Sequence, residues 1–190
     1  MDIEDPPPDK IRSAHEVAMR ALALFAAVGI ALGAPRGEVV PWLKAEQLWG
    51  ELSPLERAFL SDEDAPERTR INYSWHSERL MVLLWALGKI PALPASSAQC
   101  DTQLFQEHLP PYVDESVPSF VENARLRSDD ELLLKADELL DEHWRARDAS
   151  LNGRPPPAEV DIEIVQERHH AINWVIGYDG LPWDEVTTDT

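Results

Sequence analysis

An apolar run near the start of the chain, ALALFAAVGIALGAP at residues 21–35, constrains the fold most. It contains no charged residue, and its alanines and leucines favour a helix. A helix that is apolar all round must be buried. The run is shorter than the roughly 20 residues needed to span a bilayer. We therefore expect a central buried helix over residues 10–32, with Asp9 as its N-cap.

A second apolar run predicts another core helix, which Ser74 begins, Leu87 closes and Gly88 follows. Two such helices need further helices around them, and the remaining segments are mostly amphipathic with helical spacing. The fold class is therefore all-α, a compact single-domain bundle of about seven to nine helices, several of them short. Residues 1–8, with three consecutive prolines, are expected to be a flexible leader, and residues 9–190 to form the single helical domain.

Prolines and capping residues place the shorter helices. Their expected ranges are residues 41–49, 54–60, 102–108 and 119–126. Pro41 is expected at the first helical position of the first of these, and Asp101 and Ser116 to cap the last two. Residues 61–70, SDEDAPERTR, are expected to be a charged loop or a single turn.

Two longer helices are expected in the last third of the chain. Ser128 and Glu131 match a capping box that opens a helix over residues 128–151. Its core-facing stripe is expected at Leu133, Ala136, Leu140, Trp144 and Arg147, widened by Leu132 and Leu139. Residues 160–164 alternate like a strand, but helical spacing continues as far as Ile176, so we expect a helix there.

The C-terminal tail, residues 179–190, is expected to pack on the helical body. A floppy terminus would not usually carry Trp183 beside Leu181 and Val186. Its polar end can accept hydrogen bonds from arginines. The candidate donors in the second half of the chain are Arg125, Arg127 and Arg168.

The charge balance limits the partners of this chain. It has 17 basic and 35 acidic residues, a net charge of −18. Such a chain repels nucleic-acid phosphates and anionic membranes, so neither is expected as a partner, whereas a basic protein is attracted. Solubility alone is the simpler explanation of the acidity. A lone cysteine, Cys100, and a start without a secretory signal predict a cytoplasmic location.

The histidines supply one candidate site. His169 shares the apolar face of its helix and is expected to be a buried structural residue, whereas His170 is expected on the surface. Glu167 and His170 form a single Glu-x-x-His pair, and His143 lies on the preceding helix. Helical di-iron sites use two such pairs, so these three are only weak metal ligands. No cofactor is expected.

A pocket between the helix that starts at Ser74 and the C-terminal helix is the second candidate. Its expected lining residues are Trp75, Glu78, Arg168, His169 and Asn173. The chain lacks the P-loop, the dinucleotide fingerprint, the nucleophile elbow and the zincin motif. The favoured function is therefore a non-enzymatic protein-interaction or regulatory module. The alternatives are a small-molecule- or metal-binding enzyme using this pocket, or a structural subunit of a homo-oligomer.

Several blocks of the sequence carry a family resemblance. They include RALALFAAVGIALG, LSPLERAFL, SWHSERLMVLLWALGKIPALP, the pair Cys100-Asp101, and ERHHAINWVIGYDGLPWDEVTTDT. The chain resembles a bacterial family known as domain of unknown function 4272 (DUF4272). The resemblance implies a cytosolic helical domain and brings no activity or catalytic residue with it.

Overall fold

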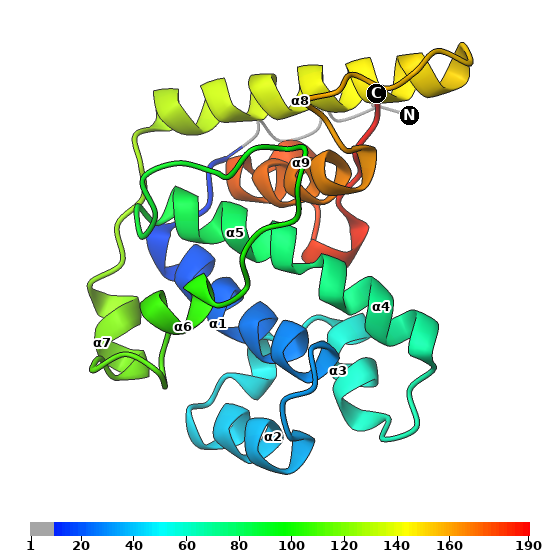
Figure 1. Ribbon diagram of the computed structural model, residues 1–190. Helices are drawn as coiled ribbons and strands as arrows, with labels where there is room; N and C mark the ends of the chain where they lie inside the picture. The colour runs from blue at the N-terminus through cyan, green and yellow to red at the C-terminus, as the bar shows by residue number, and fades with distance from the viewer. Residues whose placement is uncertain (1–9) are drawn as a thin grey trace, which may run out of the picture.

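A computed structural model describes residues 10–190, and within that range it contains helices and no β-strand (Figure 1). The all-α fold class is confirmed. The α-helices are α1 (Ala14–Ala31), α2 (Arg36–Ala45), α3 (Pro54–Ser61), α4 (Glu67–Trp75), α5 (Ser77–Ala86), α6 (Leu104–His108), α7 (Val117–Glu122), α8 (Asp129–Leu151) and α9 (Ile162–Ile176). The 3-10 turns are η1 (Trp49–Glu51), η2 (Tyr178–Gly180) and η3 (Trp183–Glu185). The expected leader and the cap Asp9 lie outside the described residues.

The central helix is α1, as its apolar sequence predicts. It packs against α5, α4, α2, α7 and α3. By length and composition alone it could cross a bilayer, but 61% of its residues are buried inside the protein. It begins later than expected, because Ser13 caps it. The Ser13 hydroxyl accepts from the Glu16 amide (3.2 Å), and the Glu16 carboxylate accepts from the Ser13 amide (2.8 Å).

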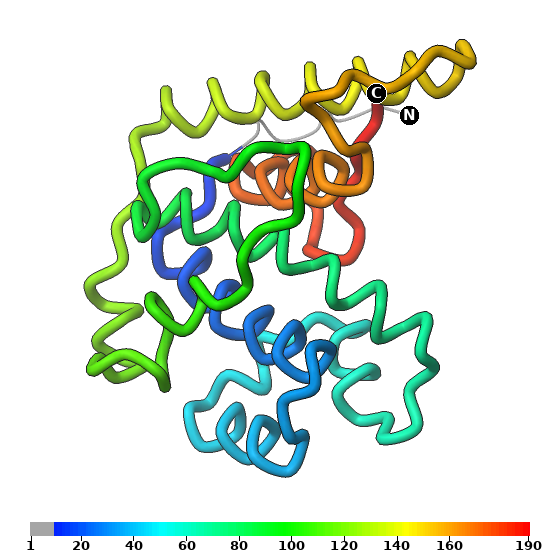
Figure 2. Tube along the Cα trace, viewed as in Figure 1, coloured from blue at the N-terminus to red at the C-terminus, as the bar shows by residue number. Residues whose placement is uncertain are grey.

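Helices α8, α9 and α5 form successive layers, with α9 in the middle (Figures 1 and 2). α8 lies at the edge of the molecule. The expected stripe on α8 is only partly right: Leu132, Ala136 and Leu139 are buried as expected, and the other buried residues are His143, Ala146 and Ala149. Leu133, Leu140 and Trp144 are exposed instead. The sequence pattern misleads here because α8 carries two apolar rows, and α9 covers only one of them.

The helix expected to start at Ser74 is divided into two. α4 begins at Glu67, within the segment expected to be a charged loop, and Ser74 lies inside it. α5 begins at Ser77, just after His76. The polar α4 is held by Tyr73, whose ring stacks on Phe59 with centroids 4.2 Å apart. A tertiary contact, not an apolar stripe, therefore stabilises this helix.

The shorter helices also differ in their ends. Pro41 is not the first residue of its helix but lies inside α2, which ends at Ala45, and Trp49 belongs to η1. Val39 and Val40 precede the proline and pack against the core. This packing extends α2 on the N-terminal side of Pro41. Asp101 caps the turn before α6 by accepting from the Gln103 amide (2.9 Å). Ser116 caps α7 as predicted, although α7 ends at Glu122.

The C-terminal tail packs on the body as predicted, with Trp183 buried. The arginines that bind it are not those expected. Arg12 donates to the carbonyl of Leu181 (2.8 Å), and Arg147 donates to the Thr190 hydroxyl (3.3 Å). The tail turns back at Gly177, which has φ +75° and whose α-carbon faces Lys10 so closely that a Cβ would meet its carbonyl oxygen at 2.0 Å. Only glycine fits this position.

Candidate functional site

Glu78 and Arg168 converge as the pocket hypothesis required, but they form a closed ion pair and do not line a cavity described here. Both side chains are almost fully buried, at 0% and 1% exposure. The Arg168 Nη2 and Nε atoms lie 2.8 and 2.9 Å from one Glu78 oxygen. The other oxygen accepts from the Cys100 amide (2.7 Å), and Arg168 also donates to the Pro94 carbonyl (2.6 Å). The pair ties α5, α9 and the intervening loop together.

His169 and Asn173 lie elsewhere. The His169 Nδ1 atom is 3.1 Å from the His143 Nδ1 atom in the layer between α8 and α9. One ring must donate and the other accept. Burial, with His143 next in importance, lowers the pKa of His169 to about 4. Asn173 donates to the Thr187 carbonyl (3.0 Å) and so anchors the tail.

Two adjoining cavities do lie between α4, the start of α5 and α9. The outer chamber, of about 550 Å³, is lined by Arg68, Ile71, Asn72, Trp75, His76, Arg79, Glu163, Gln166 and Glu167. The inner chamber, of about 260 Å³, is lined by Leu55, Tyr73, His76, Arg79, Gln166, His170, Asp184, Val186 and Thr188. They share His76, Arg79 and Gln166. Of the five expected pocket residues, only Trp75 lines either chamber.

Arg79 stands where the chambers meet. Its Nε atom pairs with the Glu167 carboxylate, and its Nη1 atom lies 3.1 Å from the His170 Nε2 atom. His170 is buried at 6% exposure, so its expected surface position is wrong. Burial, followed by the nearby Arg79 charge, lowers the pKa of His170 to about 2. The same two causes hold the pKa of His76 well below its ordinary value, so both rings are neutral at physiological pH.

The tail supplies the wall of the inner chamber opposite α4. Trp183 inserts beside the chamber, with the Arg20 guanidinium 4.9 Å and the Arg79 guanidinium 5.9 Å from its ring centroid. Its ring also meets His170 edge to face, with centroids 5.0 Å apart. Arg20 in turn pairs with the buried Glu56 (2.5 Å). The chamber therefore exists only when the tail is docked.

Several buried polar atoms have no hydrogen-bond partner among the described residues, and two of them, His76 Nδ1 and His170 Nδ1, belong to residues that line this chamber. Among the described residues they include Arg20 Nε, Glu56 Oε1, His76 Nδ1, His170 Nδ1 and Thr187 Oγ1. Each buried atom left unsatisfied costs about 1–3 kcal/mol. Unsatisfied atoms at a cavity are typical of a site that a ligand or ordered water completes.

The weak metal ligands do not come together. Glu167 pairs with Arg79, His170 faces Arg79, and His143 faces His169 on the other side of α9. Residues 10–190 contain no group of three or more His, Cys, Asp or Glu side chains placed to hold a metal. Cys100 is buried, and burial with the nearby Glu78 raises its pKa to about 12, so its thiol is unreactive.

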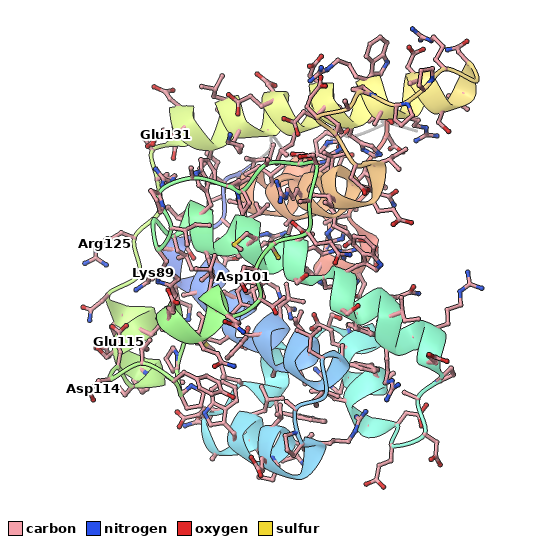
Figure 3. The ribbon with its side chains drawn as sticks, in the orientation of Figure 1. Lys89, Asp101, Asp114, Glu115, Arg125 and Glu131 are labelled. Atoms are coloured by element: carbon pink, nitrogen blue, oxygen red, sulfur yellow. The ribbon has the colours of Figure 1, made fainter. Side chains whose placement is uncertain are left out.

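A second surface feature lies on the side of α8 that α9 leaves uncovered. Leu133, Leu140, Trp144 and Leu151 are 46%, 40%, 52% and 77% exposed. They are spaced seven, four and seven residues apart and so form one line along the helix. We call them the apolar line. Figure 3 shows side chains standing out from α8 along its length, beginning with Glu131 at its N-terminal end.

An acidic row runs beside the apolar line. It consists of Asp130, Asp137, Asp141 and Asp148, each three positions before a member of the line. Residues three apart are neighbours on a helix surface. Asp141 pairs with Arg145 (2.9 Å) and Asp148 with Arg154, whereas Asp130 and Asp137 have no recorded ion pair.

The chain matches the family described as "Domain of unknown function (DUF4272)" over residues 1–186. The chain belongs to the DUF4272 family. The resemblance seen in the sequence is thereby confirmed. Searches of curated proteins and of solved structures found no match to this DUF4272 chain.

Sequence reasoning missed the most connected residues of the DUF4272 cavity. The sequence patterns do not point to Arg79, Tyr73 or Asp184. The position of Arg79 at the start of a helix, beside a histidine and a glutamate, was the sequence feature that could have indicated its role. Asp184 reaches the chamber only because the tail folds back, and no local pattern shows that.

Proposed function

We propose that this DUF4272 protein is a non-enzymatic interaction module of the cytoplasm that binds a basic amphipathic helix of a partner protein along α8. The observation that carries the proposal is the apolar line. A helix at the edge of the molecule exposes three leucines and a tryptophan in register, on the side that its own core leaves uncovered.

The apolar line has the dimensions of a helix-binding surface. From Leu133 to Leu151 it spans 18 residues, or about 27 Å at 1.5 Å per residue. Helices that dock on helices present anchors at this spacing. Tryptophan is enriched among the residues that dominate binding energy, and Trp144 is half exposed near the middle of the line.

The acidic row selects the kind of partner. A helix lying along the apolar line brings its flanking residues close to Asp130 and Asp137, which form no ion pair with any residue from 10 to 190. Lysine or arginine on the partner satisfies them and speeds encounter with a chain of net charge −18. A second copy of this chain would instead bring two acidic rows together, so like-charge repulsion disfavours a homodimer through this face.

Peptide titration tests the proposal. The probe is a labelled 18-residue helix with leucines spaced seven, four and seven apart and lysines beside them, and its control replaces the lysines with glutamates. We expect the lysine peptide to bind the full chain, the glutamate peptide not to bind, and Leu140→Asp to weaken binding about tenfold or more.

The matched control is Leu32→Asp, since Leu32 is 51% exposed and lies at the end of α1. Both variants add one negative charge, so their difference reports the apolar contact alone. Equal binding of the lysine peptide by both variants would show that only general charge attraction is at work, and the proposal would be wrong.

A further inference from the structure

The inner chamber offers more hydrogen-bond donors than its own residues satisfy. His170 shows this most clearly, because the chemistry fixes which of its nitrogens carries the proton. Its Nε2 atom faces the Nη1 atom of Arg79 at 3.1 Å. Arginine only donates, so Nε2 must accept, and the neutral ring carries its hydrogen on Nδ1. That Nδ1–H is buried and has no acceptor.

Tyr73 adds a second donor. Burial, followed by the Glu56 and Asp184 carboxylates, raises the pKa of Tyr73, so its hydroxyl keeps its proton. The ring is fixed by its stack on Phe59. No hydrogen bond of its hydroxyl is recorded among the described residues, and Tyr73 lines the inner chamber.

Arg79 supplies the positive charge. Its Nε and Nη1 atoms are engaged by Glu167 and His170, which hold the guanidinium in place. Its Nη2 atom has no hydrogen bond recorded to any described residue. The N–H groups of Nη2 are therefore available to a ligand, and guanidinium donors are well suited to binding a carboxylate or phosphate.

The acceptors around the chamber are already in use or neutral. Asp184 accepts the Leu55 backbone amide (3.0 Å), and Glu167 faces Arg79 from the outer chamber. His76 is a neutral ring whose Nδ1 atom is buried without a partner. The inner chamber is therefore lined by three donors, on His170, Tyr73 and Arg79, and by the Asp184 carboxylate, one oxygen of which accepts the Leu55 amide.

The outer chamber continues from this point with a different character. Trp75 and Ile71 supply an aromatic plane and an aliphatic side chain, and Arg68, Asn72 and Gln166 line the rim. His76, Arg79, Glu163 and Glu167 complete its lining, so a ligand there meets one aromatic plane and one aliphatic side chain among polar groups. A ligand that reaches both chambers has a polar head inside and a flat or aliphatic body outside.

We propose that the joined chambers bind a small organic carboxylate, with its carboxylate held by Arg79, His170 and Tyr73 and its body against Trp75. This binding site is independent of the partner surface on α8. It takes an oxyanion because the donors of His170, Tyr73 and the Arg79 Nη2 atom have no acceptor among the described residues, and an organic one because Trp75 and Ile71 lie in the adjoining outer chamber.

Calorimetric titration of the full chain tests the site with three defined probes: benzoate, benzamide and inorganic phosphate. Benzamide has the shape of benzoate without the charge, and phosphate has the charge without the body. We expect benzoate to bind and to raise the melting temperature with concentration, and each of the other two to bind at least about tenfold more weakly. Benzamide binding as tightly as benzoate, or phosphate alone binding, would overturn the proposed ligand class.

Gln166→Glu and its control Gln106→Glu test whether benzoate binds in the joined chambers, and Tyr73→Phe tests one of the donors. Gln166→Glu places a negative charge at the exposed rim shared by both chambers, and Gln106→Glu places the same charge on α6. We expect the first to weaken benzoate binding about tenfold and the second to leave it unchanged. Tyr73→Phe removes one donor and keeps the ring stack, and we expect an affinity loss of about five- to tenfold. Equal benzoate affinity in Gln166→Glu and Gln106→Glu would place any binding elsewhere and overturn the site.

Discussion

At the scale of single residues, the molecule depends on charges that are buried in matched pairs. The Glu78–Arg168 pair has no solvent access, and each of its spare atoms binds a backbone group of the loop between α5 and α6 or the Ser96 hydroxyl. A buried pair contributes little net stability over apolar residues of the same shape, but it cannot lose one member cheaply. The sequence indicated these two residues as the lining of a ligand-binding pocket, and the structure shows them joining two helices and a loop.

Glu78→Gln is therefore expected to destabilise the protein strongly. It leaves the Arg168 charge buried without a counterion, which costs about 3–5 kcal/mol. Urea denaturation gives the free energy of unfolding, and Glu67→Gln on the exposed start of α4 is the matched control. A loss below about 1 kcal/mol for Glu78→Gln would contradict this role of the ion pair.

The buried histidines predict how stability depends on pH. The pKa values of His169 and His170 are lowered to about 4 and about 2, so the folded protein keeps these rings neutral where the unfolded chain protonates them. Their contribution is fully present above pH 6.5, the ordinary histidine value, and is lost as the pH falls below it. Each ring lowers the free energy of unfolding by roughly 1.4 kcal/mol for each pH unit below pH 6.

His169→Gln tests this dependence between pH 6.5 and 5, where few carboxylates titrate. We expect the free energy of unfolding to fall less steeply with acid in this variant than in the parent chain. His15→Gln is the matched control, because His15 is exposed. The same slope in His169→Gln and the parent would refute the account of a buried neutral pair with His143.

At the scale of helices, the sequence patterns predicted features that depend on residues close in the chain. They failed for features that depend on contacts between distant residues. The capping box of Ser128 begins α8 as predicted, because its interactions lie within four residues. The break between α4 and α5 was not predicted, since α4 is polar and is held by the stack of Tyr73 on Phe59. The expected apolar stripe of α8 mixes residues of the buried row with residues of the exposed row, because both rows have helical spacing and only the packing of α9 distinguishes them.

The tail is the element whose removal has the clearest expected effect. Deleting residues 181–190 removes buried Trp183 and opens the inner chamber. Loss of the tryptophan side chain alone costs about 3–5 kcal/mol. Thermal unfolding measures the loss, and Trp183→Ala separates the side chain from the rest of the tail. A truncated chain that melts at the parent temperature would show that the tail does not stabilise the body.

At the scale of the whole molecule, the sequence predicted the all-α class, the central helix and the docked tail. These follow from composition and apolar periodicity, which need no knowledge of which helices meet. A cavity lies between α4, α5 and α9, close to where the sequence analysis expected a pocket. Of the expected lining residues, however, only Trp75 lines it. Glu78, Arg168, His169 and Asn173 satisfy one another or the backbone instead. Which polar groups pair off and which face a cavity depends on three dimensions, so spacing along the chain does not show it.

At this scale, part of the net charge of −18 can also be assigned to one surface of the molecule. α8 carries an acidic row beside an exposed apolar line, so part of the charge lies where a partner helix would dock. Solubility alone explains an acidic surface, but it does not explain exposed leucines and a tryptophan in register along 18 residues. The combination is what the interaction proposal rests on.

The most direct test of that proposal is photo-crosslinking in cells with benzoylphenylalanine in place of Trp144. The account predicts a discrete crosslinked protein whose attached peptide is a basic amphipathic helix, and loss of that product when Leu140→Asp is added. The same probe in place of Leu32 serves as the control. A yield at position 144 no greater than at position 32, or a product that persists with Leu140→Asp, would contradict the account.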